Sequence, residues 1–292
     1  MSLPEQLLKE KIRGFLEEDI GLGDITTELI VPLGVRVRAQ IIVKEEAVVA
    51  GLQELKVLFN MVNAKISFFV HEGEEVPPNT VIAEIEGEGR EILAVERTAL
   101  NILSRMCGVA TATRRLINKI KDAGLNVRVA ATRKTAPGLR YFDKRAIIVG
   151  GGDPHRFRLD DQILIKDNHV AIAGSIEEAL RRVHSAVSFS KKIEVEAKTL
   201  EQAIKAAELG ADIIMLDNMT VEEARKAIKA LEEMKLRSNV LIEISGRINE
   251  ENIIRYAELK PDIISVGELT HSVRSVDVSL EVIEVVTAQQ NS

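Results

Sequence analysis

The second half of the chain alternates short β-branched segments with amphipathic helical ones, and this alternation constrains the fold more than any other feature. Strands are predicted at 126–132, 162–166, 191–197, 211–217, 240–245 and 262–267, and helices near 175–184, 199–209, 220–236 and 249–259. Strands buried on both faces and joined by crossover helices form a parallel sheet. Six such strands in about 145 residues, with one further strand that the pattern does not place, predict an open, incomplete parallel α/β barrel. A doubly wound sheet is the competing architecture, but no G-x-G-x-x-G follows any strand.

The first third has a different pattern, with strands predicted at 35–43, 64–70 and 80–86 and a helix near 53–62. A Ser-x-x-Glu pattern at residues 2–5 predicts a capping box that opens a first helix. A long helical region is predicted from Glu91 to about Asp122, with Gly108 at a joint inside it. We therefore expect an N-terminal α/β layer (sandwich) domain at 1–108, the barrel at 109–275, and a C-terminal segment at 276–292 that packs back on the N-terminal domain.

The composition argues against several classes of protein. No apolar run approaches the roughly 18–20 residues of a membrane span, and a formal net charge of −6 disfavours nucleic acid as a partner. Cys107 is the only cysteine, so neither a disulfide framework nor a paired-cysteine metal site is expected. The first residues are charged rather than typical of a signal peptide. These features favour a cytoplasmic protein without a membrane partner.

Against this acidic background, residues 132–169 form a basic cluster. The cluster holds eight Lys and Arg against five Asp, which gives it a net charge of +3. Its cations follow apolar runs such as VRVAATRK and QILIKDNH instead of lying along one helix face. The pattern therefore favours a pocket for a compact polyanion over a solvated charged surface.

Polar residues and glycines end the predicted barrel strands, which is where the active sites of such barrels lie. They are Thr132, Arg133, Lys134, Lys166, Glu196, Asp217, Ser245, Gly246 and Gly267. An ordinary loop start explains Lys166, Glu196 and Asp217 poorly, because each directly follows an apolar run, although a structural ion pair among them stays open. Glu194 lies on the same strand face as Glu196, and Glu243 on the same face as Ser245. We hypothesise that Glu194 and Glu243 form a lower polar layer that orients Lys166 and nearby arginines.

Two acids beside several cations and glycine-containing strand ends fit a sugar phosphate as ligand. Carboxylates hold ribose hydroxyls or Mg²⁺, and glycine turns offer backbone N–H groups to a phosphate. A second group, made of Arg133, Lys134, His155 and Arg156, adds donors for carboxylates or phosphates.

Eight segments spread nearly end to end match the motifs of one family. They are EDIGLGDITTELI (18–30), ERTALNILSRMCGVAT (96–111), ATRKTAPGLR (131–140), GGGDPHRFRL (150–159), LIKDNH (164–169), IEVEA (193–197), IIMLDN (213–218) and VGELTHS (266–272). In these segments the chain resembles quinolinate phosphoribosyltransferase, the decarboxylating nicotinate-nucleotide pyrophosphorylase of de novo NAD synthesis and a type II phosphoribosyltransferase. The resemblance implies an N-terminal layer domain, an open barrel, and a homo-oligomer that is a dimer or a dimer-based hexamer.

The resemblance also implies a role for each candidate residue. Quinolinate is expected to contact Thr132, Arg133, Lys134, His155 and Arg156, with Arg97 donated by the partner subunit. Lys166, Glu196 and Asp217 are expected to be catalytic, around the ribose and pyrophosphate of phosphoribosyl pyrophosphate (PRPP). The phosphate end is expected to contact Ser245, Gly246, Arg247, Val266, Gly267, Glu268 and His271. Arg247 departs from the small residue usual in the family, and either a phosphate contact or a solvent-facing side chain fits it.

The implied cofactor is Mg²⁺, held mainly through PRPP with Glu196 and Asp217 nearby. The implied reaction transfers phosphoribose to quinolinate with loss of CO₂ and gives nicotinate mononucleotide and pyrophosphate. Three alternatives stay open: a relative acting on another pyridine acid such as nicotinate, a Schiff-base aldolase using Lys166, and a non-catalytic ligand-binding barrel. The adjacent His155 and Arg156, beside Arg133, favour a substrate with two carboxylates.

Overall fold

The computed structural model describes residues 3–286, which form two compact units. The first unit contains the described residues up to Ala112, Pro137–Gly151, and the described residues from Val273 on. The second contains Thr113–Ala136 and Gly152–Ser272. The chain therefore crosses between the units four times, and neither unit is one continuous segment.

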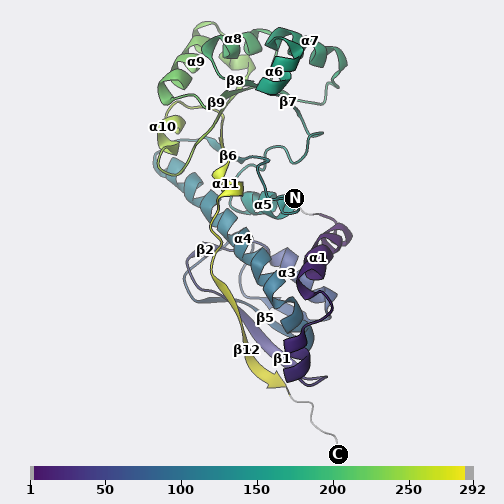
Figure 1. Cartoon of the computed structure of the whole chain (residues 1–292). Helices are drawn as coiled ribbons and strands as arrows, with labels where there is room; N and C mark the ends of the chain where they lie inside the picture. Colours follow the sequence, from purple (N-terminus) through teal and green to yellow (C-terminus); the bar gives the residue numbers. More distant parts are fainter. Residues whose placement is uncertain (1–2, 287–292) are drawn as a thin grey trace, which may run out of the picture. The chain divides into compact units, whose positions relative to one another are not determined.

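The first unit is built on a four-stranded antiparallel sheet in the order β12-β1-β5-β3 (Figure 1). Its strands are β1 (Arg36–Val43), β3 (Lys65–Phe68), β5 (Thr80–Glu88) and β12 (Val278–Val286), with a separate pair of β2 (Ala47–Val48) and β4 (Glu75–Val76). Its helices are α1 (Glu5–Ile20), α2 (Ile25–Ile30), α3 (Leu52–Met61), α5 (Arg140–Val149) and the part of α4 (Gly89–Asp122) up to Ala112. Strand β1 buries every second residue, as expected for a strand with one face on a core. The expected α/β layer is confirmed.

The last described strand completes this sheet. Strand β12 pairs with β1 in antiparallel register, from Val43 opposite Val278 to Arg36 opposite Val286. Residues 287–292 of the expected C-terminal segment lie outside the described residues, and so does Ser2 of the expected capping box. Helix α1 begins at Glu5, with Pro4 as its N-cap residue and no side-chain capping bond.

Helix α4 runs without interruption for 34 residues, so the joint predicted at Gly108 is wrong. Gly108 instead allows a close approach of backbone. A Cβ atom there would lie 2.2 Å from the backbone oxygen of Arg274 and 3.2 Å from the Cα of Ser275. The neighbouring Val276 is tied to the same helix, because its N–H donates to the backbone oxygen of Ser104 at 3.0 Å. Space, rather than backbone conformation, requires glycine at position 108.

We expect Gly108→Ala to lower the free energy of unfolding by about 1–3 kcal/mol, since the added methyl group must displace backbone. Equilibrium unfolding in urea measures this change. Gly14→Ala is the matched control, because Gly14 also lies inside a helix of this unit and its Cβ would meet nothing within 4 Å. That substitution should raise stability by about 0.5–1 kcal/mol. Equal stability of the two variants would contradict the role given to Gly108.

The second unit is a parallel sheet of six strands in the order β6-β11-β10-β9-β8-β7 (Figure 1). Its strands are β6 (Arg128–Ala131), β7 (Ile163–Ile165), β8 (Ile193–Ala197), β9 (Ile213–Asp217), β10 (Leu241–Ser245) and β11 (Ile263–Val266). Its helices are α6 (Asp167–Ala173), α7 (Ile176–Ala186), α8 (Leu200–Glu208), α9 (Val221–Glu233), α10 (Ile253–Ala257) and α11 (Glu268–His271), with a 3-10 turn at Arg237–Asn239. Strands β6 and β7 form the two edges, so the predicted open barrel is confirmed. In the described residues this sheet has six strands, and the seventh that we expected is not among them.

Short connections join strands β8 and β9 of this unit to the helices α8 and α9 that follow them. Helices α7, α8 and α9 begin after Ser175, Thr199 and Thr220, and each of these side chains accepts a hydrogen bond from a backbone N–H three residues later. Such N-caps fix where a helix begins, so the polar residues at the strand ends are held on short connections. None of the helices in residues 3–286 is long and apolar enough to cross a membrane.

Candidate active site

A cavity of about 250 Å³ opens at the carboxyl ends of the six parallel strands. It is lined by residues of all six strand ends and of the 155–156 loop: Ala131, Thr132, Arg133, Lys134, His155, Arg156, Leu164, Lys166, Glu196, Met215, Asp217, Glu243, Ser245 and Ser265. Because parallel strands all end at the same edge of a sheet, residues distant in sequence meet here.

Most residues predicted from the sequence line this cavity, and a second group lies outside the lining. The residues outside it are Arg97, Glu194, Gly246, Arg247, Val266, Gly267, Glu268 and His271. Gly267 still borders the cavity, since a Cβ there would lie 3.7 Å from the Cδ of Lys134 and 3.1 Å from the Nε2 of His271. Arg97 lies exposed on α4 in the other unit.

The turn after β10 requires glycine. Gly246 has a φ of 104°, and a Cβ atom there would lie 2.8 Å from the Cα of Asn218. The next residue, Arg247, also has a left-handed backbone, with a φ of 51°. The absence of a side chain at Gly246 lets this turn lie close to Asn218, which follows β9.

Two arginines of the cavity have no acidic partner in the described part of the chain. Arg156 is 8% exposed, and in residues 3–286 no carboxylate lies within 4.0 Å of its guanidinium or that of Arg133. The Nε of Arg133 is buried without a hydrogen-bond partner. Burial, followed by repulsion from Arg133, lowers the pKa of Arg156. A buried cation beside a partly buried one is stabilised by an anion that binds both of them, so this part of the cavity fits an anionic ligand.

Other residues of the cavity combine one cation with two acids. The Nζ of Lys166 donates to Oε1 of Glu196 at 2.7 Å, and the lysine side chain is 43% exposed while the glutamate is 11% exposed. Asp217 ends β9 opposite Ser245 of β10 and accepts a hydrogen bond from the Asn218 side chain at 2.9 Å. These carboxylates have the oxygen atoms that bind ribose hydroxyls or Mg²⁺.

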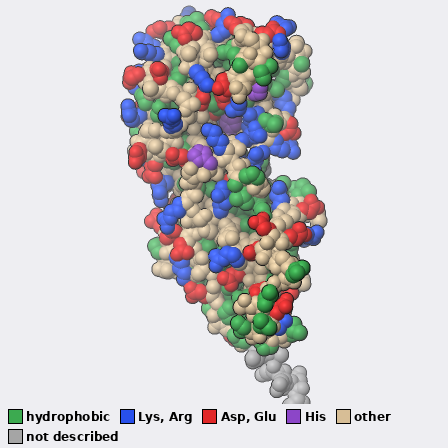
Figure 2. All heavy atoms as spheres, in the orientation of Figure 1, with side chains coloured by type: hydrophobic (Ala, Val, Ile, Leu, Met, Phe, Trp, Pro, Cys, Tyr) green, Lys and Arg blue, Asp and Glu red, His purple; other side chains and the backbone are tan. Residues whose placement is uncertain are grey.

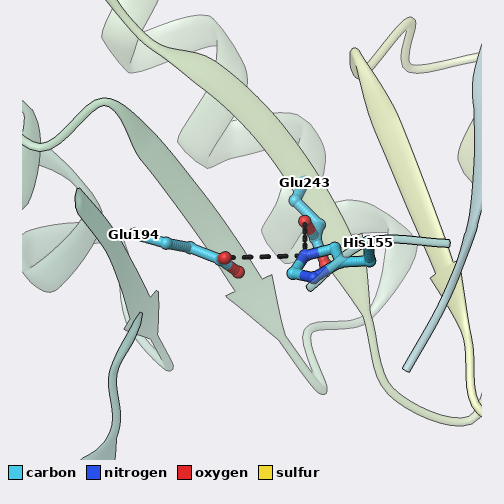
Figure 3. A group of neighbouring side chains, drawn as sticks. All are labelled: His155, Glu194 and Glu243. Carbon is cyan, nitrogen blue, oxygen red and sulfur yellow. Dashed lines mark hydrogen bonds and ion pairs between the residues drawn. The ribbon is translucent and has the colours of Figure 1, made fainter. Parts of the chain in front are cut away.

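His155, Glu194 and Glu243 form a histidine–carboxylate cluster, with the imidazole ring between the two carboxylates (Figure 3). The Nε2 of His155 lies 3.1 Å from Oε2 of Glu243 and 3.5 Å from Oε2 of Glu194, and both glutamates are fully buried. Glu243 also accepts a hydrogen bond from the Ser265 hydroxyl, and Glu194 accepts one from the Gln162 amide. Burial and the neighbouring Glu243 raise the pKa of Glu194.

Glu194 and Glu243 were expected to orient Lys166 and nearby arginines, but in the structure they contact a different side chain. Glu194 and Glu243 form a polar layer, but their contacts are to His155, whereas Lys166 pairs with Glu196. Gln162 and Ser265 complete this layer, and neither was predicted from the sequence. Ser265 offered a signal, since it is a hydroxyl residue inside the apolar run IISV. Gln162 offered none, because it stands in a polar loop before β7.

One group of side chains in the site has the spacing of a set of metal ligands. Among the described residues, His155, Glu194 and Glu243 form the group whose ligand atoms lie close enough to hold an ion, all within 4.8 Å of one another. The contacts of the His155 ring with both carboxylates account for this closeness. Glu196 and Asp217 also line the cavity and offer carboxylate oxygens to a cation that enters with a ligand.

Figure 2 shows how the surface charges are distributed on one face of the molecule. Lys and Arg side chains are interspersed there with Asp and Glu side chains. A mixture of this kind gives no continuous basic track for a nucleic-acid backbone on that face. The uncompensated cations described above lie instead within the cavity.

Comparisons with known proteins cover both units. The C-terminal domain of quinolinate phosphoribosyl transferase matches residues 109–281, and the N-terminal domain of that family matches residues 24–107. A probable nicotinate-nucleotide pyrophosphorylase (carboxylating) of Methanocaldococcus jannaschii is 49% identical over 270 residues, which cover 92% of this chain and 94% of that protein. The human nicotinate-nucleotide pyrophosphorylase (carboxylating) is 37% identical over 82% of this chain and 80% of its own length. The crystal structure of NadC from Streptococcus pyogenes has a TM-score of 0.90 at 34% identity and covers 98% of this chain and 100% of that one.

Proposed function

This chain belongs to the quinolinate phosphoribosyltransferase family, and from that premise we propose that its barrel site transfers phosphoribose from PRPP to quinolinate. The products are nicotinate mononucleotide, pyrophosphate and CO₂, so the enzyme is a pentosyltransferase of NAD biosynthesis. The observation that carries the substrate assignment is the pair of arginines without acidic partners, Arg133 and Arg156. Quinolinate has two neighbouring carboxylates, and each arginine offers bidentate donors to one carboxylate.

The two substrates divide the cavity between them. In our proposal, Arg133 and Arg156, with Thr132, Lys134 and His155 beside them, bind quinolinate. Lys166, Glu196 and Asp217 bind the ribose and pyrophosphate of PRPP, and the phosphate end lies toward Ser245, Gly246, Arg247, Val266, Gly267, Glu268 and His271. The alternatives of a nicotinate-specific enzyme and of an aldolase that uses Lys166 are not favoured by the family.

The proposed reaction has two steps. The pyridine nitrogen forms a bond to C1 of the ribose, and the bond from C1 to the pyrophosphate oxygen breaks. Positive charge develops on the ribose in that transition state, and the carboxylates of Glu196 and Asp217 stabilise it. The bond to the 2-carboxylate then breaks, CO₂ leaves and a proton takes its place, while the arginines hold the ring.

Mg²⁺ fits the acidic side of the cavity. Hard divalent cations prefer oxygen ligands and often bind through substrate phosphates. Glu196 and Asp217 would hold Mg²⁺ together with PRPP, and the ion would neutralise charge on the leaving pyrophosphate. The residues of this chain supply every other contact in the proposal.

We also propose that the enzyme is a homo-oligomer, a dimer or a dimer-based hexamer, in which Arg97 completes the quinolinate site of the partner subunit. Arg97 is exposed on α4 and does not line the cavity of the second unit. The resemblance to the family supports this role, in which the exposed guanidinium binds a carboxylate in the site of another copy of the chain. We place the enzyme in the cytoplasm, where the buried free thiol of Cys107 is compatible with a reducing environment.

One assay tests the proposed function directly. Purified enzyme should form nicotinate mononucleotide and CO₂ from quinolinate, PRPP and Mg²⁺, measured by chromatography of the nucleotide and release of carboxyl-labelled CO₂. Trapping with borohydride in the presence of carbonyl substrates is the control for an aldolase, and it should label no lysine. Absence of nucleotide formation would refute the proposal.

Nicotinate should be a poor substrate, with kcat/KM lower by at least about a hundredfold, because a missing carboxylate leaves buried cations unpaired. Phthalate keeps both carboxylates but lacks the ring nitrogen, so it should inhibit competitively against quinolinate without reacting. Steady-state kinetics with the three compounds measures both effects. Similar kcat/KM values for nicotinate and quinolinate would support the alternative substrate.

A further inference from the structure

His155 is held at both ring nitrogens by groups of the protein itself. The backbone N–H of Arg156 donates to Nδ1 of His155 at 2.7 Å. Because Nδ1 accepts, the ring proton lies on Nε2, which faces Glu243 at 3.1 Å and Glu194 at 3.5 Å. The backbone of His155 is also unusual, with a left-handed φ of 52° and its N–H bound to Asp153 Oδ1 at 2.7 Å. The ring therefore links the buried carboxylates to the backbone of Arg156.

The carboxylate end of this link is rigid and costly to bury. Glu243 comes from β10 and is fixed by the hydroxyl of Ser265 on β11, the adjacent strand. Glu194 comes from β8, has one oxygen bound to Gln162 and the other buried without a partner. The other charged groups that act on Glu194 are Arg156 and Glu196. Buried carboxylates with incomplete partners cost stability, so this cluster beneath a substrate cavity calls for an explanation beyond packing.

Arg156 is the group that needs such support. Its guanidinium is 8% exposed, is repelled by Arg133 and has no carboxylate within ion-pair distance in the described chain. A buried cation without an acidic partner is positioned mainly by its own backbone. The bond from the Arg156 N–H to the His155 ring is the contact that fixes this backbone next to the cavity.

We propose that Glu243 is a positioning residue of the quinolinate clamp, which acts through the His155 ring to hold Arg156 in place. The proposal rests on the proposed function of the cavity. When Glu243 is removed, the ring loses its main acceptor, the left-handed turn at His155 relaxes, and the Arg156 guanidinium moves away from the bound carboxylate. PRPP should be affected little, because Lys166, Glu196 and Asp217 are held by other contacts.

The test compares Glu243→Leu with Glu243→Gln. The leucine variant removes the acceptor, and its KM for quinolinate should rise by about tenfold or more, since a charge-assisted hydrogen bond is lost. Its KM for PRPP should stay within about twofold of that of the wild type. The glutamine variant keeps a carbonyl oxygen for His155, so its KM for quinolinate should change by no more than about threefold. A purely structural role would instead lower the melting temperature and kcat and leave both KM values unchanged.

A double-mutant cycle with Arg156→Lys tests whether Glu243 acts through that arginine. In the Arg156→Lys background, Glu243→Leu should add little to the KM for quinolinate, because the group that it positions has been replaced. Multiplicative effects of the two substitutions would overturn the proposal. If Glu243→Leu does not fold, His155→Asn tests the same link, since asparagine tolerates a left-handed backbone but lacks the ring. An unchanged KM for quinolinate in that variant would also overturn the proposal, whereas an inactive wild type would refute the proposed function itself.

Discussion

Lys166→Ala is expected to lower kcat at least about a hundredfold while leaving the fold intact. The ammonium group ends β7 at the cavity and pairs with Glu196 at 2.7 Å, on the side assigned to PRPP. Removing a preorganised charge where charge develops in a transition state typically costs two to three orders of magnitude in kcat, about 2.7–4 kcal/mol. The lysine side chain is 43% exposed, so its loss should change the free energy of unfolding little. Steady-state kinetics and thermal unfolding measure the two quantities.

A second lysine of the same unit gives a matched control. Lys192 forms an ion pair with Asp212 at 2.6 Å, just before β8 begins, and it does not line the cavity. Lys192→Ala removes the same type of side chain from a similar pair, and its kcat should equal that of the wild type. Glu196→Ala, by contrast, should be as damaging as Lys166→Ala, since it leaves the lysine without its partner. Near wild-type kcat in Lys166→Ala would remove this residue from the mechanism and leave the ion pair a structural one.

The barrel and its strand ends were predictable because they depend on local patterns. Parallel strands that are buried on both faces appear in the sequence as apolar runs. The polar residue that ends each run therefore marks the carboxyl end of a strand. Lys166, Glu196 and Asp217 were found in this way, and the structure places all three in one cavity. The prediction succeeded because parallel register brings strand ends together whatever the lengths of the helices between them.

Contacts between distant segments were not predictable from such patterns. The C-terminal segment was expected to pack on the N-terminal domain, but its pairing with β1 as a strand of the sheet was not predicted. Helix α5 belongs to the first unit although it lies between two barrel strands in sequence. Likewise, His155 and Glu243 are 88 residues apart, and nothing in either local sequence indicates their hydrogen bond. Gly108 shows the same limit, because its role depends on the backbone of Arg274. Each of these contacts depends on the tertiary structure, which brings together segments that are far apart in the sequence.

Arg97→Ala is expected to abolish quinolinate turnover, although the residue lies outside the cavity of its own chain. In the proposed dimer each site takes its barrel residues from one chain and Arg97 from the other. Arg97→Ala and Lys166→Ala should therefore each be inactive, since every site in either homodimer lacks one group. Mixing the two proteins and allowing subunits to exchange produces heterodimers in which one site carries both defects and the other carries neither.

Activity should then recover to about one quarter of the wild-type value in a random 1:1 mixture, because half of the dimers are mixed and each has one intact site of two. Native mass spectrometry of differently tagged chains measures the exchange, and nucleotide formation measures the activity. A mixture of Lys166→Ala with Glu196→Ala is the matched control. Both defects there lie in the barrel of the same chain, so each site of the heterodimer keeps one defect and no activity should return. Complete exchange without recovery for Arg97→Ala would place this arginine in the site of its own chain or outside the reaction, and the exposed face of α4 that carries it would then need another function.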